Sequence, residues 1–164
     1  MKNLLEAQNL KAYYRLVDGI QIRAVDGVTL ELRPNEVLGI AGESGCGKST
    51  LAAVISLTHN PPLHVIDGEV TANGFDLLRL PKEQARREIK GKYISVVPQG
   101  AMNALNPTQR VRNFAIDMLQ EHQPDMTKQD AVDLARARLQ ELSLPERVLT
   151  SYPHELSGGM KQRT

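Results

Sequence analysis

The first forty residues carry a pattern that predicts two paired strands. From Val28 to Leu32 apolar and polar residues alternate, which is the period of a strand with one buried face. Residues 4–10 form a second strand-like segment, and Asp18-Gly19 between the two is a turn signal. We therefore predict that residues 4–10 pair with residues 27–32. Residues 68–74 are predicted to form a further short strand that ends in a tight turn.

Two short apolar runs predict buried strands of a different kind. They span residues 37–41 and 94–97, and a continuous apolar run of this length is typical of a parallel strand that is covered on both faces. Residues 51–57 are apolar and compatible with a helix, which Asn60-Pro61-Pro62 would end. This order of strand, loop and helix favours an α/β fold.

The second part of the chain is predicted to be helical. Residues 111–121 and 128–142 carry apolar residues at helical spacing, and Thr127 is a suitable cap for the second of these helices. Residues 81–90 are charged, which predicts a helix with a solvated face.

These patterns divide the chain into three parts. Residues 1–99 read as an α/β core, residues 100–155 as a small helical unit, and residues 156–164 as the beginning of a further helix. Neither repeats nor low-complexity segments interrupt this order.

Composition adds several exclusions. The 164 residues, 41% of them hydrophobic and with a net charge of +1, are those of one globular domain without the basic footprint of a nucleic-acid-binding protein. No run of about 18 apolar residues could span a membrane, and the N-terminus lacks the apolar core of a signal peptide. The single cysteine, Cys46, excludes an internal disulfide and fits a reducing compartment.

Residues 42–50 carry the strongest chemical signal. They read G-E-S-G-C-G-K-S-T and fit the phosphate-binding pattern G-x-x-x-x-G-K-[ST]. Glycines let successive N–H groups face phosphate oxygens, Lys48 brings a positive charge to the β- and γ-phosphates, and the Ser49 hydroxyl can ligate Mg²⁺. The helix that follows adds the positive end of its dipole. The expected strand before the loop and helix after it favour a nucleoside triphosphate site over a simple Gly/Ser turn.

Three other features carry chemistry, each with a structural alternative. Ser157-Gly158-Gly159 joins a helix cap to bare amides, and the basic residues Lys161 and Arg163 follow where a helix dipole prefers acids. This suggests a bound anion, although a plain loop would give the same letters. Gln99, at the end of the 94–97 run, can ligate Mg²⁺ or position water, or can simply be an exposed strand end.

The tyrosine pair Tyr13-Tyr14 is the third of these features. One ring can stack on adenine, and an ordinary half-buried strand tyrosine is the alternative. Cys46 presents a similar choice, because a helix N-terminus can activate its thiol, but a small residue that fills a variable loop position is the favoured interpretation.

The motifs in this order resemble those of one family. G-E-S-G-C-G-K-S-T, then Pro98-Gln99, then L-S-G-G-M-K-Q-R are similar to the Walker A motif, the Q-loop and the signature motif of the nucleotide-binding domain of ABC transporters. The stretch Q-G-A-M-N-A-L-N-P from Gln99 to Pro107 resembles the run found in ATPase subunits of dipeptide, oligopeptide and nickel importers. The fold implied is a P-loop NTPase domain with an N-terminal antiparallel β subdomain and a helical subdomain.

The resemblance also implies roles for matching positions. Lys48 and Gln99 are the expected catalytic residues, Ser49 and Gln99 the Mg²⁺ ligands, and Tyr14 the aromatic residue on adenine. The γ-phosphate held by an opposite subunit would contact Ser157, Gly158 and Gly159. The phosphates would be held by Gly42, Ser44, Gly45, Cys46, Gly47, Lys48, Ser49 and Thr50.

The implied protein is an ATPase that couples ATP and Mg²⁺ to peptide uptake. Its partners would be a second ABC ATPase subunit bound head to tail, transmembrane permeases and, indirectly, a substrate-binding protein, with no nucleic acid. It would be cytoplasmic and peripheral on the inner face of the membrane. Met160 stands where many members have Gln, which changes little in this expectation.

The family's Walker B aspartate and glutamate and its later histidine would follow the signature motif, and the sequence ends at Thr164 before those positions. We therefore expect a piece of a longer ATPase or a naturally truncated one, whose 164 residues alone bind ATP weakly or not at all and hydrolyse it negligibly.

Other functions stay open at this point. A catalytically incomplete module that regulates a transporter would carry the same motifs. A DNA-repair type ABC ATPase would be expected to show heptads or zinc-binding cysteines between Gln99 and Ser157, and this span has neither. A P-loop kinase would leave the L-S-G-G segment without a role.

Overall fold

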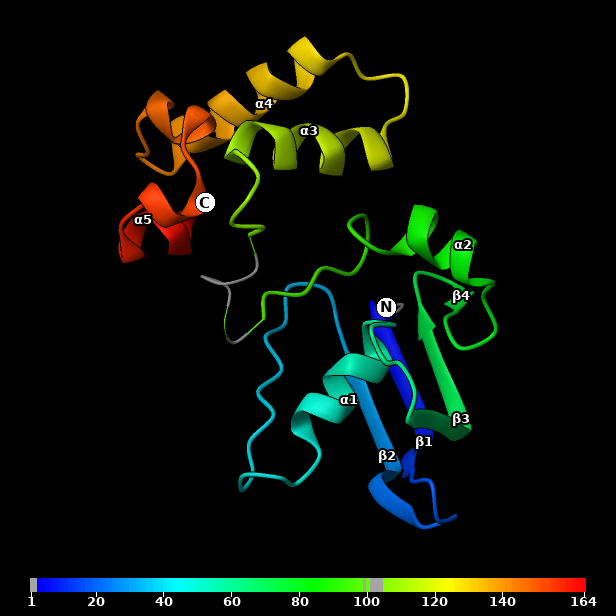
Figure 1. Cartoon of the computed structure of the whole chain (residues 1–164). Helices are drawn as coiled ribbons and strands as arrows, with labels where there is room; N and C mark the ends of the chain where they lie inside the picture. Colours follow the sequence, from blue (N-terminus) through cyan, green and yellow to red (C-terminus); the bar gives the residue numbers. More distant parts are fainter. Residues whose placement is uncertain (1–2, 99, 101–104) are drawn as a thin grey trace. The chain divides into compact units, whose positions relative to one another are not determined.

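The computed structural model of the chain describes residues 3–98, 100 and 105–164 (Figure 1). The residues group into two compact units, Met1–Ser95 and Val96–Thr164. Each unit has a hydrophobic cluster made from its own elements.

The first unit is built on an antiparallel sheet. Strands β1 (Leu5–Arg15), β2 (Gln21–Leu32), β3 (Leu63–Ala72) and β4 (Phe75–Asp76) are arranged in the order β2-β1-β3-β4. The predicted pairing of residues 4–10 with residues 27–32 is confirmed, since Leu5 lies opposite Leu32 and Leu10 opposite Val28. The predicted strand and tight turn at residues 68–74 are also found, in β3 and the turn before β4.

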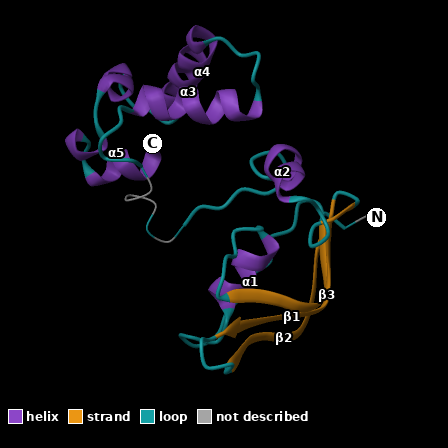
Figure 2. Cartoon of the chain, turned by 45° about the vertical axis from the view of Figure 1, so that its right-hand side comes forward, coloured by secondary structure: helices purple, strands orange, loops and turns teal. Residues whose placement is uncertain are grey.

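Helix α1 (Lys48–Ile55) lies against one face of this sheet (Figures 1 and 2). Its buried residues Leu51 and Val54 join Leu10, Val25 and Val70 of the strands in one cluster. Burial of apolar side chains at this interface, at roughly 25 cal/mol per Å², fixes the helix on the sheet. Two short helical segments, α2 (Lys82–Gln84) and the π-helical η1 (Ala85–Ile89), confirm the predicted helix over residues 81–90.

The two predicted parallel strands are absent from the described residues, and that expectation is wrong for this structure. Residues 37–41 and 94–97 have irregular backbone apart from an isolated bridge between Lys90 and Ile94. Val37 is 97% exposed and Val97 is 86% exposed. A strand of this apolar kind forms when neighbours satisfy its backbone groups and cover its faces. No described strand runs beside either segment, so the apolar pattern has nothing to pack against.

The second unit is helical. Helices α3 (Val111–His122) and α4 (Lys128–Glu141) confirm the two predicted helices and pack together, as Figure 2 shows. Thr127 caps α4 as predicted, because its hydroxyl oxygen accepts the Asp130 N–H at 3.1 Å. The unit also contains two 3₁₀ segments, η3 (Glu146–Thr150) and η4 (Pro153–Glu155), and helix α5 (Gly158–Arg163). No helix in the described part of the chain is long and apolar enough to cross a bilayer.

Candidate functional site

The glycine loop of residues 42–50 ends on the first turn of α1, and its last glycine fits only without a side chain. Gly47 is the N-cap of α1 and has φ +97°. A Cβ atom on Gly47 would lie 2.1 Å from the carbonyl oxygen of Ala24 in β2. The loop therefore lies directly on the backbone of the strand, which sets where α1 begins.

A bulge in β2 creates this contact. Ala12 lies opposite Val25 while the next residue, Tyr13, lies opposite Arg23, so the register shifts by one residue at Ala24. An extra residue of this kind leaves the ladder and re-aims the local backbone. The sequence around Ala24 carries no Gly or Pro signal for a bulge, so pattern reasoning does not predict it.

The ammonium group of Lys48 lies inside the loop. Its Nζ donates to the carbonyl oxygens of Gly42 at 2.8 Å and Glu43 at 2.6 Å, and it lies 3.4 Å from Cys46 Sγ. The loop thus holds a positive charge at its centre. A Cβ atom on Gly42 would lie 2.7 Å from the same sulfur, so the loop also closes tightly on itself.

The first turn of α1 offers donors beside this charge. The N–H groups of Gly47, Lys48, Ser49 and Thr50 have no hydrogen-bond acceptor among the described residues, as expected at the start of a helix. The Ser49 residue is exposed. Amides, a lysine and a helix N-terminus at one place form a site for an anion.

Of the two tyrosines, Tyr14 lies beside the loop. Its hydroxyl is 3.1 Å from Thr50 Oγ1 in α1, and its ring packs on the first hydrophobic cluster. Tyr13 points to the other side of β1, where its hydroxyl donates to Asp26 at 2.6 Å and Arg23 lies over its ring. That bond raises the pKa of Tyr13 and lowers the pKa of Asp26.

The signature segment belongs to the second unit and is exposed. The Ser157 hydroxyl oxygen accepts the Met160 N–H at 3.4 Å, so it caps α5. Gly158 and Gly159 have ordinary backbone angles, and a Cβ atom on either would meet nothing within 4 Å. Nothing in the described part of the chain sterically requires glycine at these positions. Arg163, which the sequence suggested only as a basic residue beside a bound anion, donates to the Leu142 carbonyl at 3.1 Å and so attaches α5 to the end of α4.

The remaining predicted site residues lie in different parts of the chain. Ser44, Gly45 and Cys46 lie in the exposed part of the glycine loop. Gln99 lies outside the described residues. The loop and Tyr14 are brought together in the first unit, whereas Ser157–Gly159 lie in the second. Among the described residues no group of three or more His, Cys, Asp or Glu side chains could hold a metal ion.

A match to a known protein family identifies the kind of domain that carries this glycine loop. The model of the family described as "ABC transporter" matches residues 25–164, which is most of the chain. The chain belongs to the ABC transporter family. An ATP-binding cassette is a nucleotide-binding fold, so the glycine loop lies in a domain of the predicted class.

Individual relatives agree with the family match. The chain is 38% identical over 164 residues to the dipeptide transport ATP-binding protein DppD of Caldanaerobacter subterraneus subsp. tengcongensis, covering 99% of this chain and 50% of that protein. It is 37% identical to the oligopeptide transport ATP-binding protein OppF of Salmonella typhimurium, covering 99% of this chain and 49% of that protein. The resemblance to peptide-importer ATPase subunits is thereby confirmed, and the chain spans about half the length of these curated relatives.

Solved structures show the same fold. The ATP-binding cassette MJ0796, solved as a dimer in a post-hydrolysis state bound to ADP and phosphate, superposes with a TM-score of 0.75 at 24% identity, covering 97% of this chain and 66% of that one. A second dimeric structure of MJ0796, described as a bacterial ABC transporter cassette, gives a TM-score of 0.74 at 25% identity with the same coverage. The predicted fold class, an ABC-type P-loop domain with an antiparallel β subdomain and a helical subdomain, is confirmed.

Proposed function

We propose that this chain is the nucleotide-binding part of an ATPase subunit that powers the import of dipeptides or oligopeptides. The observation that carries the proposal is the glycine loop, in which the Lys48 ammonium and the free first-turn amides of α1 converge. A triphosphate is the ligand that matches a row of donors beside a single lysine. The relatives' names supply the transport function and the peptide class.

Each residue of the loop then has a physical task. The amides of Gly45, Gly47, Lys48 and Thr50 bind phosphate oxygens, and Lys48 exchanges its bonds to the Gly42 and Glu43 carbonyls for bonds to the phosphates. Since the amides are already in place, binding needs little reorganisation of the backbone beyond this exchange by Lys48, which favours stabilisation of charge that develops on the γ-phosphate.

The residues also fit Mg²⁺ and adenine. The exposed Ser49 hydroxyl follows Lys48 at the start of α1, and Mg²⁺ prefers oxygen ligands that it shares with phosphate. When bound, Mg²⁺ neutralises charge on the phosphates. Gln99 is the second ligand proposed, from its sequence position. Tyr14 is the residue proposed to contact adenine, since its hydroxyl already contacts Thr50 in the first turn of α1, beside the phosphate loop.

We assign Ser157, Gly158 and Gly159 to the γ-phosphate of ATP held by a second ATPase subunit. The two glycines have open space around them within this chain, which supports close approach by an external ligand. The other partners proposed are permeases in the membrane and, through them, a substrate-binding protein, which places the subunit on the inner face of the membrane. We retain the division into residues 1–99, 100–155 and 156–164 as core, helical subdomain and start of the signature helix.

Nuclear magnetic resonance on isotope-labelled protein tests nucleotide binding. Addition of ATP and Mg²⁺ is expected to shift the amide signals of Gly45 and Gly47, even when binding is weak. The shifts should vanish in Lys48→Ala and persist in Lys92→Ala, a lysine outside the loop. Loop signals that stay unchanged at millimolar ATP in the full-length subunit would refute the proposal.

The transport assignment needs the full-length subunit with its permeases. In such an assembly Lys48→Ala is expected to abolish ATP-driven uptake of a labelled dipeptide, while Lys92→Ala retains it. ATP-driven uptake that is equal in the two variants would count against the assigned role.

A further inference from the structure

The first unit contains a cavity that the glycine loop does not explain. It encloses about 740 Å³ and is lined by the segment after α1, by β3, and by the β4–η1 region. This volume is in the range of pockets that hold small molecules, roughly 300–1,000 Å³. Leu57, two residues beyond the C-terminal end of α1, lines the cavity, whereas the glycine loop lies at the N-terminal end of that helix.

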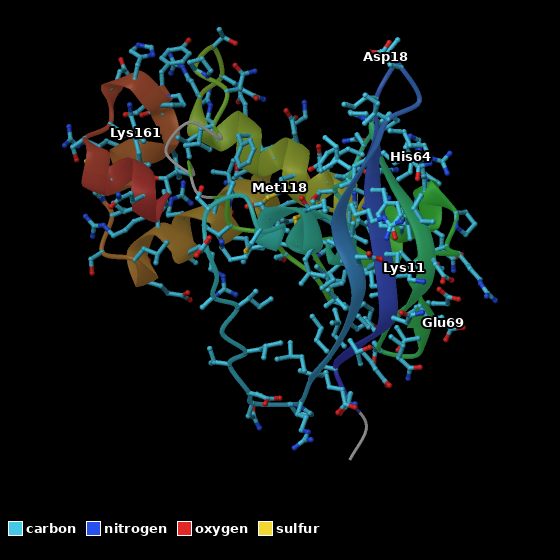
Figure 3. All side chains as sticks on the ribbon, turned by 90° about the horizontal axis from the view of Figure 1, so that it is seen from below. Lys11, Asp18, His64, Glu69, Met118 and Lys161 are labelled. Carbon is cyan, nitrogen blue, oxygen red and sulfur yellow. The ribbon has the colours of Figure 1, made fainter. Side chains whose placement is uncertain are left out.

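Positive charge gathers on the walls of this cavity. Lys82, Lys90, His59 and His64 all line it, and neither lysine makes an ion pair in the described part of the chain. Figure 3 labels His64 on β3, toward the hairpin tip that carries Asp18. Arg86 also lines the cavity.

The acidic groups nearby are already paired. Arg86 forms an ion pair with Glu83 at 2.7 Å, so the charge of Arg86 is already compensated, and the lysines and histidines remain. Asp67 is the acidic residue of the lining, and Lys11 pairs with it at 3.2 Å. The walls therefore carry an excess of uncompensated positive charge.

His59 is held in an unfavourable environment when the cavity has no ligand. Its Nδ1 atom is buried and makes no hydrogen bond within the described part of the chain. Burial lowers the pKa of His59 despite the opposing effect of the Ala53 backbone, and the charges of Lys90, Lys82 and His64 lower it further. An anion in the cavity would offset the three neighbouring charges and so favour the protonated form of His59.

The rest of the lining is apolar. Leu57, Leu63, Leu77, Leu78 and Leu80 contribute to the wall, and Leu63 and Leu77 are buried. A small inorganic anion would leave this apolar surface in contact with water, whereas a ligand with an apolar part would bury it.

From this combination we propose that the cavity binds an amphipathic anion, an organic phosphate, sulfonate or carboxylate whose charged group faces Lys82, Lys90 and His59 and whose apolar part covers the leucines. The site is separate from the glycine loop and does not depend on nucleotide binding. A soluble metabolite and the headgroup of an anionic lipid both present this chemistry.

Octanesulfonate is a suitable probe because its charge is constant with pH. Titration of the purified protein, followed by the ring proton signals of His59 and His64, is expected to show saturable binding. Octanol and inorganic sulfate, which each lack one half of the chemistry, should bind at least about tenfold more weakly. Lys90→Gln should weaken octanesulfonate binding by about tenfold, since it removes one charged hydrogen bond, whereas Lys92→Gln, outside the cavity, should change it less than about twofold.

The pH dependence gives an independent readout. Because the bound anion favours protonated His59, the pKa of His59 should rise on binding and the affinity should increase as the pH falls through that pKa. Arg86, Asp67 and His64 also face the cavity, and His59→Gln should reduce the pH dependence while the signals of His64 still report binding.

Vesicles of phosphatidylcholine with and without phosphatidylglycerol separate the two sources of ligand. Co-sedimentation with the anionic vesicles that Lys90→Gln abolishes assigns the cavity to a lipid headgroup. Octanesulfonate binding without co-sedimentation assigns it to a soluble ligand. If neither binds, or if Lys90→Gln and Lys92→Gln behave alike, the proposal is overturned.

Discussion

Replacement of Gly47 by alanine tests how the β2 bulge positions the glycine loop. The new methyl group would lie 2.1 Å from the Ala24 carbonyl oxygen, at a position with φ +97°. Two costs follow from this geometry. A left-handed backbone costs an L-residue about 1–2 kcal/mol, and overpacking against a fixed backbone atom adds about 1–3 kcal/mol. We therefore expect Gly47→Ala to lower the free energy of unfolding of the first unit by about 2–5 kcal/mol.

Two other glycines separate the contributions. Gly19, in the turn between β1 and β2, has φ +75°, and a Cβ atom there would meet nothing within 4 Å. Gly19→Ala should therefore cost only the backbone term, about 1–2 kcal/mol. Gly45 in the loop has φ +83° and the same open surroundings, so Gly45→Ala should match Gly19→Ala even though it lies in the loop.

Urea unfolding followed by circular dichroism measures these differences, provided that the dependence on urea keeps the same slope in each variant. The difference between Gly47→Ala and Gly19→Ala isolates the contact with Ala24. Equal losses in the two variants would show that the loop does not lie on the bulge, and the account of how the site is positioned would be wrong.

Three further expectations concern other contacts. Tyr14→Phe keeps the ring and removes the 3.1 Å bond to Thr50, so it should cost about 1 kcal/mol in urea unfolding and weaken nucleotide binding less than Tyr14→Ala; a larger loss of affinity in Tyr14→Phe would contradict this. The hydrogen bond from Arg86 and its charge lower the pKa of Glu83 from 4.5 to about 2, so its stabilising effect is present above pH 4.5 and is lost as the pH falls toward 2; the melting temperatures of the wild type and Glu83→Gln should converge over that interval, and a constant difference would argue against the pair. Gly159→Ala should raise stability by up to about 1 kcal/mol, because helical glycine is less stable than alanine and the methyl group meets nothing, while ATP hydrolysis by the full-length dimeric subunit falls; unchanged hydrolysis would exclude close approach of the nucleotide.

Local pattern predicted much of the fold because the relevant signals lie within a few residues of each other. The alternation at residues 28–32, the helical spacing at residues 111–121 and the Thr127 cap each depend on neighbours along the chain. The same reasoning failed for residues 37–41 and 94–97. Their apolar runs specify that they can be buried, but a strand also requires a partner strand, and the described residues supply none.

The candidate site divides in the same way. The spacing of Gly42, Gly47 and Lys48 can be recognised from the sequence alone, since a phosphate loop is a local structure whose glycines and lysine are close in the chain. The family resemblance already named Tyr14 rather than Tyr13, but the physical reason, the alternation of side chains across β1, applies only once the sheet and α1 are in place.

The sequence by itself therefore determined the family, the glycine loop, most helices and the antiparallel hairpin. The tertiary structure alone decided three things: the bulge that brings Ala24 against Gly47, the attachment of α5 by Arg163, and the basic cavity around His59. Each joins residues at least twenty positions apart, where contact depends on the register and packing of whole elements. Such contacts have no local signature, because the free energy that selects them comes from burial across the fold rather than from neighbouring residues.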